Sequence, residues 1–195
     1  DWSSDVCSSD LEDLVRATLD AIRGGPETIV HVYNSTSRTQ REKVFRMSKD
    51  ETLERAVLAT KLVRSLSDKG DVPVQFQYSP ESFTGTEREF ALAVCNAVIE
   101  AWGPTPERPI IINLPSTVEM STPNVYADQI EWMSRGLKRR DCVVLSVHPH
   151  NDRGTSVAAA ELAIMAGAQR VEGTVFGFGE RAGNCDLVQL AENVR

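Results

Sequence analysis

The sequence predicts an α/β fold that forms part of a (β/α)8 TIM barrel, with about five of the eight βα units present. Short runs rich in Val, Ile and aromatic residues alternate with longer helical patterns, which indicates parallel strands joined by helical crossovers. Each expected strand is followed by polar residues. A barrel builds its site from the ends of many strands, whereas a doubly wound sheet uses one switch point, so this distribution favours the barrel.

Five segments have the short length and β-branched or aromatic composition of strands. They are residues 28–33, 72–78, 109–113, 142–147 and 170–175. Helical segments are expected between and around them, at residues 11–23, 49–68, 86–102, 123–137 and 155–166, with a further helix starting at Asp186. Within 86–102 the apolar residues Phe90, Val94, Ala97 and Val98 recur every three to four positions, which predicts one buried helical face.

The composition excludes several classes of function. Lys and Arg number 21 against 28 Asp and Glu, a net charge of −7. The longest basic run is the triplet at 138–140, so we expect no nucleic-acid partner. No apolar stretch approaches the roughly 20 residues that cross a bilayer, and no secretory signal is visible, so we expect a cytoplasmic protein without membrane contact. The 4 cysteines are widely spaced and are expected to be reduced thiols.

The two ends of the chain differ from the middle. Residues 1–11, DWSSDVCSSDL, are polar, lack periodicity and resemble translated sequencing-adapter read-through. We therefore expect a non-native segment at 1–11 and a partial-barrel catalytic domain at 12–195. The chain stops at AENVR within an expected helix, and we expect both ends to be truncated.

The triplet His148-Pro149-His150 is the sharpest feature of the sequence. Alternate side chains of an extended backbone share a face, so both imidazoles point the same way, and Pro149 marks the point where ladder bonding stops. Two imidazoles on one face offer two nitrogen ligands to a divalent ion. The alternative is that they are hydrogen-bonded strand-end residues without a metal.

Other polar residues near strand ends have two interpretations each. Asn184 precedes the last helix and could act as its N-cap, while its loop, GFGERAGN, weakly matches a dinucleotide-binding pattern. Glu81 could be a general base, a substrate clamp or a solvated loop carboxylate. Asn113 and Thr117 could bind a carboxylate or simply form turns.

Together these segments resemble the 2-isopropylmalate synthases, from about residue 11 to residue 193. The resemblance rests on VHVYNSTS, QYSPESFTGTE, INLPSTVEMSTPNVYADQIEW and LSVHPHNDRGTSVAAAELAIMAGAQRVEGTVFGFGERAGN. The HPHNDRGT form is similar to the longer class of these enzymes. Homocitrate and citramalate synthases carry similar HxHND and GERAGN elements, so those two motifs alone identify only the metal-dependent superfamily.

The resemblance implies a TIM barrel that binds Mg2+ or Mn2+ and condenses acetyl-CoA with 2-oxoisovalerate in leucine biosynthesis, in a homodimeric parent. A Lewis acid stabilises the alkoxide charge that develops on the attacked ketone. By motif, His148, His150 and Asn184 match metal ligands, and Glu81 matches a catalytic carboxylate. The residues that match substrate-binding or pocket-lining positions are His31, Ser79, Asn113, Pro115 and Thr117.

The sequence also departs from that pattern. The fourth metal ligand of the family, an Asp in an Arg-Asp motif at the end of the first strand, has no counterpart here, and QLAENV differs from the expected continuation. We therefore expect these residues alone to be inactive. A homocitrate- or citramalate-type synthase, a non-catalytic metal- or small-molecule-binding half-barrel and an H-x-H metal hydrolase stay open as alternatives.

Overall fold

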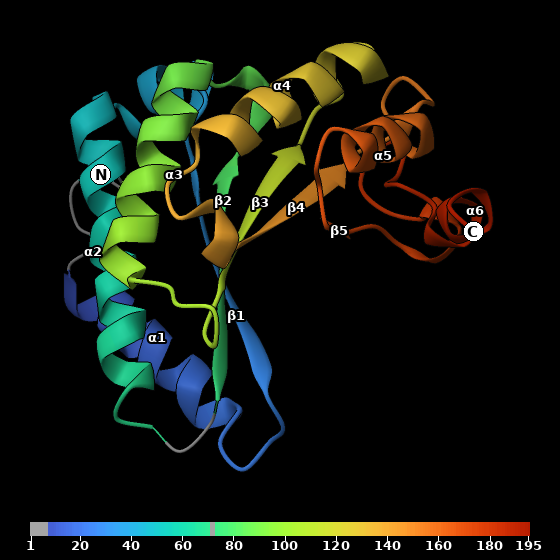
Figure 1. Cartoon of the computed structure of the whole chain (residues 1–195). Helices are drawn as coiled ribbons and strands as arrows, with labels where there is room; N and C mark the ends of the chain where they lie inside the picture. Colours follow the sequence, from blue (N-terminus) through green and yellow to red (C-terminus); the bar gives the residue numbers. More distant parts are fainter. Residues whose placement is uncertain (1–7, 71–72) are drawn as a thin grey trace.

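The computed structural model describes residues 8–70 and 73–195, in which a parallel five-stranded sheet has the order β1-β2-β3-β4-β5 (Figure 1). The strands are β1 (Thr28–Ser35), β2 (Val74–Glu81), β3 (Ile110–Ser116), β4 (Val143–Pro149) and β5 (Arg170–Val171). The α-helices are α1 (Ser8–Ala21), α2 (Lys49–Ser67), α3 (Arg88–Trp102), α4 (Pro123–Gly136), α5 (Ser156–Met165) and α6 (Leu187–Asn193).

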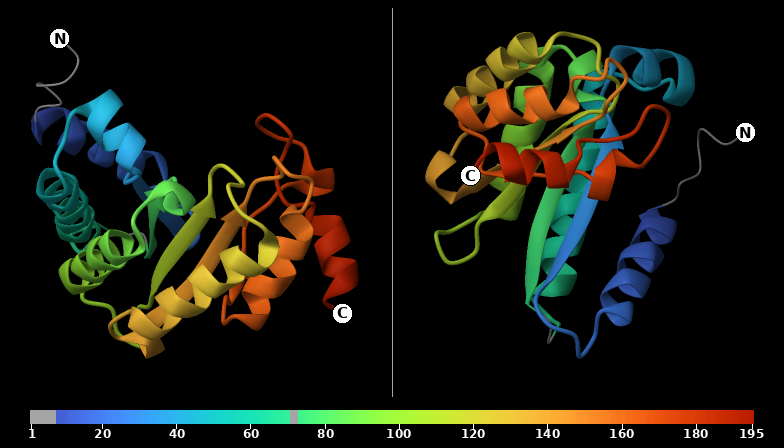
Figure 2. Two further views of the ribbon diagram at one scale, coloured as in Figure 1. Left: turned by 90° about the horizontal axis from the view of Figure 1, so that it is seen from above. Right: turned by 90° about the vertical axis from the view of Figure 1, so that its right-hand side faces the viewer.

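The helices cover one side of a curved sheet. Strands that neighbour each other in sequence also pair in the sheet, and α2 to α5 lie along its convex side in the view from above (Figure 2). A doubly wound sheet would reverse its strand order and carry helices on both faces. This arrangement confirms the partial barrel predicted from the sequence.

Strand alternation separates an apolar outer face from a polar inner face. On β2, Phe76 and Tyr78 point outward and are fully buried, and Phe76 stacks on Trp102 of α3 with ring centroids 4.4 Å apart. Equivalent outward positions of β3 and β4 are Ile110, Ile112, Leu114, Val143, Leu145 and Val147, all buried. Because successive side chains alternate, the residues between them project from the concave face.

The observed strands differ in length from the prediction. β1, β2, β3 and β4 each end two or three residues further along than expected, so that several of the polar residues predicted to follow a strand lie within it. β4 ends at Pro149, as its missing amide predicts. β5 is confined to Arg170–Val171, since the backbone beyond it pairs with the segment around residue 185. Residue 72, predicted to begin the second strand, lies outside the described residues.

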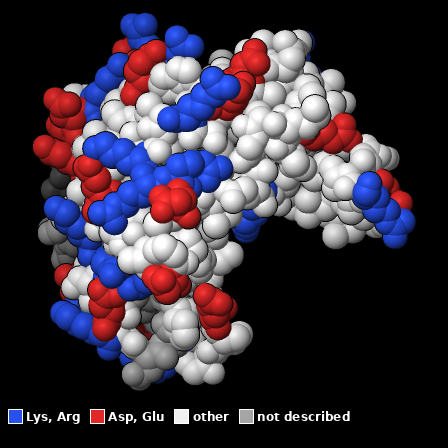
Figure 3. Space-filling view, in the orientation of Figure 1, with Lys and Arg blue, Asp and Glu red and all other residues white. Residues whose placement is uncertain are grey.

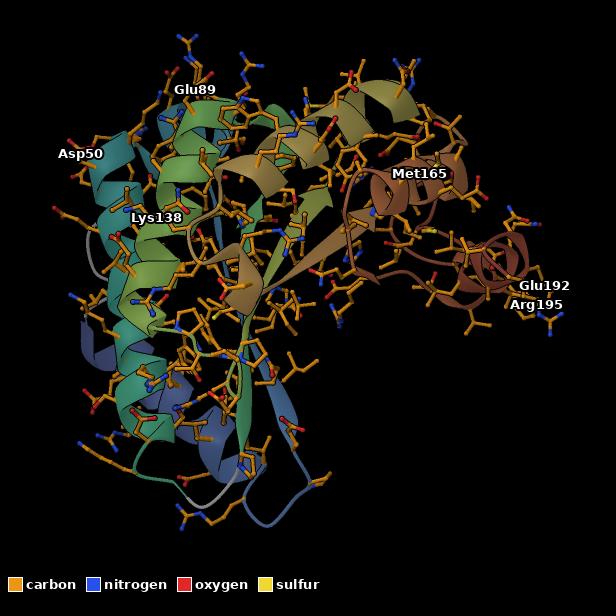
Figure 4. All side chains as sticks on the ribbon, in the orientation of Figure 1. Asp50, Glu89, Lys138, Met165, Glu192 and Arg195 are labelled. Carbon is orange, nitrogen blue, oxygen red and sulfur yellow. The ribbon has the colours of Figure 1, made fainter. Side chains whose placement is uncertain are left out.

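The helices match their predicted positions within about three residues. α1 begins at Ser8, while residues 1–7 of the expected non-native segment lie outside the described part, so the boundary at residue 11 stays a prediction. α2 begins with a capping box formed by Ser48 and Glu51. Figure 4 places Asp50 and Glu89 at the same end of the molecule, in the first turns of α2 and α3. Acidic side chains in a first turn stabilise the helix through their interaction with its dipole.

Surface charge is mixed on the helical side. Figure 3 shows basic and acidic side chains intermingled over α2 and α3, with a larger uncharged area toward α5. In residues 8–70 and 73–195, no helix combines the length and hydropathy that a membrane span requires.

A π-helix at Gln40–Phe45, which the sequence analysis did not predict, is fixed to α3 by an ion pair. The Arg41 side chain is only 5% exposed and donates to both carboxylate oxygens of Glu87 at 2.9 and 2.7 Å. Burial raises the pKa of Glu87, but the hydrogen bonds from its backbone, Arg41 and Lys49 outweigh that effect and hold the pKa at about 2.

We expect Glu87→Gln to lower the free energy of unfolding by about 1 kcal/mol at neutral pH, because Glu87 is 36% exposed and solvent screens the pair. A depressed carboxyl pKa stabilises the fold above its unfolded value near 4.5 and loses that effect as the pH falls toward about 2. Urea titrations should therefore show that the unfolding free energies of wild type and Glu87→Gln become equal as the pH falls from near 4.5 to about 2.

The control for this prediction is Glu89→Gln, at a carboxylate that is 69% exposed. It should change stability by less than about 0.5 kcal/mol. If the difference in unfolding free energy between wild type and Glu87→Gln stays constant from neutral pH to about pH 2, the stabilising role of the Arg41–Glu87 ion pair is wrong.

Candidate active site

The concave face of the sheet carries polar side chains at the carboxyl ends of its strands. Three lie on alternate residues of β2, namely Gln77, Ser79 and Glu81, and they face the same side because the strand period is two. The corresponding positions on the other strands are His31 of β1, Asn113 and Pro115 of β3, and Ser146 and His148 of β4. In a barrel this end of the strands forms the mouth where sites assemble.

The imidazoles of His148 and His150 lie on one side of the chain. Their ring centroids are 5.3 Å apart and their planes differ by 25°. The backbone is extended through Pro149, so the two rings stack side by side as the alternation rule predicts.

Asn184 reaches the same place from a distant loop. Residues 183–185 run antiparallel to residues 149–151, with Asn151 donating to the Gly183 carbonyl at 2.9 Å and Cys185 to the Pro149 carbonyl at 3.0 Å. This pairing places Asn184 Oδ1 2.9 Å from His148 Nε2. The alternative of an Asn184 N-cap is wrong, because Asp186 caps α6 through bonds from two backbone amides.

Glu172, which the sequence analysis did not single out, lies at the centre of the inner face. Its Oε2 is 2.9 Å from His148 Nδ1, and its Oε1 accepts from Gln77 Nε2 at 2.6 Å and from Arg170. Burial raises the pKa of Glu172, but the bonds from His148, Arg170 and Gln77 outweigh it and set the pKa at about 2. The hydrogen bond to Glu172 raises the pKa of His148 more than burial lowers it.

A hydrogen-bonded chain joins most of the sequence-predicted residues. His31 Nε2 lies 2.7 Å from Ser79 Oγ, and Asn113 Nδ2 donates to Ser79 Oγ at 3.0 Å and to Glu172 Oε2 at 3.3 Å. Glu172 then connects to His148. Asn113 Oδ1 is buried without a hydrogen-bond partner, which leaves one acceptor available at this face.

Glu81 and Thr117 lie at the mouth but outside this chain. Glu81 Oε2 accepts from Ser35 Oγ at 2.5 Å, and Glu81 lines a cavity of about 270 Å³ with Tyr33 and Arg41. Thr117 Oγ1 accepts from the Ser82 amide at 2.9 Å, which ties the loop after β3 to the loop after β2. The buried residue Pro115 follows Asn113 on the same face of β3.

Arg181 connects the Asn184 loop to the loops after β3 and β4. It donates to Asp152 at 2.7 Å and to the Thr117 carbonyl, and its Nη2 lies 3.1 Å from His150 Nδ1. The bond from Arg181 is the main cause of the Asp152 pKa of about 2, while burial lowers the pKa of His150. An open cavity of about 710 Å³ adjoins Asn184 and Arg181.

The donor set fits a divalent cation. Two ligands that bind one octahedral ion at right angles, each about 2.1 Å away, lie about 3.0 Å apart, and His148 Nε2 and Asn184 Oδ1 are 2.9 Å apart. Within the described ranges no three His, Cys, Asp or Glu residues form a group that could hold a metal ion by themselves, so the set depends on the amide oxygen of Asn184. Arg181 must release His150 on coordination, because a ring that binds a metal through one nitrogen cannot accept a hydrogen bond at the other.

Fold and site together define part of a parallel-stranded barrel with polar residues at the strand ends, and the chain belongs to the HMGL-like family, whose pattern it matches over residues 5–195. It is homologous to 2-isopropylmalate synthases. That of Ralstonia nicotianae is 57% identical over 195 residues, which is all of this chain and 34% of the relative. That of Corynebacterium glutamicum is 59% identical over 184 residues, 94% of this chain and 30% of the relative.

The chain thus spans about a third of the length of these relatives. Among solved structures, HMG-CoA lyase from Brucella melitensis aligns with a TM-score of 0.64 at 16% identity, over 92% of this chain and 61% of that chain. The carboxyl transferase domain of Rhizobium etli pyruvate carboxylase aligns with a TM-score of 0.63 at 9% identity, over 98% and 28%. These two likenesses support the fold, and the 2-isopropylmalate synthases are generally metal-dependent.

Gly179 holds space for Asn184, since a Cβ at Gly179 would lie 1.9 Å from Asn184 Nδ2. We expect Gly179→Ala to displace the amide and to weaken Mn2+ binding by about tenfold or more, the range seen when ligand geometry is disturbed. Gly70→Ala, where a Cβ meets only ordinary contacts at 3.6 Å, is the control. Electron paramagnetic resonance of free Mn2+ measures the affinity of each variant. Equal Mn2+ affinities for Gly179→Ala and Gly70→Ala would show that the position of Asn184 does not matter for cation binding.

Proposed function

We propose that this chain carries a large part of the active site of a 2-isopropylmalate synthase, which joins acetyl-CoA and 2-oxoisovalerate to give 2-isopropylmalate and CoA. The observation that supports this most is the convergence of His148, His150 and Asn184 from two separate segments. Identities of 53 to 59% with curated 2-isopropylmalate synthases over nearly the whole chain favour this reaction over those of homocitrate or citramalate synthases.

His148, His150 and Asn184 would hold Mg2+ or Mn2+. When bound, the ion supplies Lewis-acid polarisation of the ketone of the 2-oxo acid. The imidazoles and the amide oxygen are neutral ligands, so the bound cation keeps its charge for the anionic substrate. The parent is proposed to be a homodimer in the cytoplasm.

The other inner-face residues bind and orient the substrate. The hydroxyl of Ser79 and the imidazole of His31 form one hydrogen-bonded unit with Asn113, and this unit provides directional polar contacts beside the 2-oxo acid. Thr117 supplies a hydroxyl for the substrate carboxylate, and Pro115 forms an apolar part of the wall. Fixing both reactants in this way lowers the entropic part of the barrier.

Glu81 is the proposed base that takes a proton from the methyl group of acetyl-CoA. Its carboxylate lies on the same face of β2 as Ser79, and the Ser35 hydroxyl orients one oxygen. The other oxygen can accept the proton, since a carboxylate has several acceptor positions. Positioned general bases contribute about 10²- to 10⁴-fold to rate.

We expect the 195-residue chain to bind Mn2+ at one site and His148→Ala or Asn184→Ala to weaken that binding by at least about tenfold. Each substitution removes one donor atom from the shared position. Equilibrium titration followed by the Mn2+ resonance signal measures the affinity. Tyr33→Phe, at a side chain that is 62% exposed, is the control. An unchanged Mn2+ affinity in His148→Ala would refute the metal site.

We expect these residues alone to show no acetyl-CoA-dependent turnover, because they span about a third of the relatives. Joining them to the remaining segments of the Ralstonia nicotianae relative should restore thiol release with 2-oxoisovalerate, and His150→Ala should then remove most of it. A thiol reagent follows CoA release. Turnover by the 195-residue chain alone, abolished by a chelator, would contradict the assignment.

A further inference from the structure

We propose that Glu172 is a positioning residue that keeps His148 in the tautomer with its proton on Nδ1 and so leaves Nε2 free to bind the cation. The inference rests on the proposed function, because it concerns the same cation site. It is carried by the geometry around the Glu172 carboxylate and by the surrounding donors, which together require a proton on His148 Nδ1.

The contact between Glu172 and His148 fixes the Nδ1 proton. Glu172 Oε2 lies 2.9 Å from Nδ1, and an ionised carboxylate can only accept hydrogen bonds. Nδ1 must therefore carry a hydrogen. In the neutral ring Nε2 then has a free lone pair.

The carboxylate itself cannot rotate freely. Its Oε1 accepts from Gln77 Nε2 at 2.6 Å and from Arg170, while its Oε2 also accepts from Asn113 Nδ2 at 3.3 Å. The Glu172 side chain is 18% exposed. Donors from β2, β3 and β5 thus hold the Glu172 carboxylate from several directions. Because His148 Nδ1 hydrogen-bonds to this carboxylate, the position of the carboxylate sets the orientation of the His148 ring.

In the neutral ring with its proton on Nδ1, the Nε2 lone pair points at a second acceptor, Asn184 Oδ1, at 2.9 Å. Two acceptors at this distance repel each other unless a positive charge or a proton lies between them. Cation binding removes that repulsion. The arrangement carboxylate–histidine–metal is a general means of orienting ligands, and its loss costs about 10- to 100-fold in metal affinity.

Glu172→Gln tests this geometry with little change in shape. Arg170 can only donate, so the Gln oxygen must face Arg170 and the new amide NH2 must face His148 Nδ1. The NH2 then donates to Nδ1 and shifts the ring proton to Nε2. Asn113 can rotate its amide so that its buried, unpartnered Oδ1 accepts from the same NH2, so the variant is expected to fold.

Two measurements on the 195-residue chain separate the outcomes. The ¹⁵N shifts of His148 in the metal-free, neutral state report the tautomer, and Mn2+ titration reports the affinity. Wild type should show the Nδ1–H form, and Glu172→Gln should show the Nε2–H form with affinity at least about tenfold weaker. Glu161→Gln, at a carboxylate whose contact is with Asn193 of α6, controls for the loss of one negative charge and should match wild type.

The other possible results distinguish a failure of the positioning role of Glu172 from a failure of the cation site. If Glu172→Gln keeps the Nδ1–H tautomer, or binds Mn2+ within twofold of wild type, the positioning role is wrong while the cation site stands. If wild type has the Nδ1–H tautomer but binds no Mn2+, the proposed function is wrong while the tautomer assignment stands. Should Glu172→Gln fail to fold, Glu172→Asp, which keeps the charge but shortens the reach, must also lose affinity, or the proposal is overturned.

Discussion

The structure depends on the alternation of side chains along parallel strands that are covered by helices on one side only. On β2, Phe76 and Tyr78 pack under α3, whereas Gln77, Ser79 and Glu81 project to the concave face. On β3 and β4 the same alternation buries Leu114 and Val147 and turns Asn113 and His148 to the inner face, so that burying the apolar residues under the helices also gathers polar residues at one mouth. The same constraint that forms the core therefore forms the site.

A second level of organisation is backbone pairing outside the sheet. Residues 183–185 pair with residues 149–151 and carry Asn184 to His148 and His150. Glu172, next to β5, then links His148 to β2 and β3 through Gln77 and Asn113. The candidate ligands are thus held by hydrogen bonds from three strands and a loop, an arrangement that keeps donor atoms in place before a cation binds.

Much of this could be predicted from the sequence. Apolar periodicity located the helices, and the spacing of His148 and His150 in an extended segment predicted that their rings share a side, as they do. Strand ends were less predictable, because residues such as Asn34 and Ser35 are polar but continue the ladder of β1 when a neighbouring strand supplies partners. The roles of Glu81, Thr117 and the proposed ligands stay predictions.

Long-range contacts explain what the sequence did not reveal. From its local sequence alone Asn184 fitted an N-cap better than a ligand, and only the pairing with residue 150 assigns it elsewhere and leaves the cap to Asp186. The sequence did not predict a role for Glu172, because its partners Gln77 and Asn113 are 95 and 59 residues away along the chain. A carboxylate inside the predicted strand at residues 170–175 was the available signal.

The central claim is that His148, His150 and Asn184 share one cation, and anomalous diffraction from crystals of the chain soaked in Mn2+ tests it most directly. We predict one anomalous peak within about 2.0 to 2.4 Å of His148 Nε2, Asn184 Oδ1 and a ring nitrogen of His150, with Arg181 withdrawn from His150. A Mn2+ peak at other residues, with Arg181 still on His150 and none between His148 and Asn184, would contradict it.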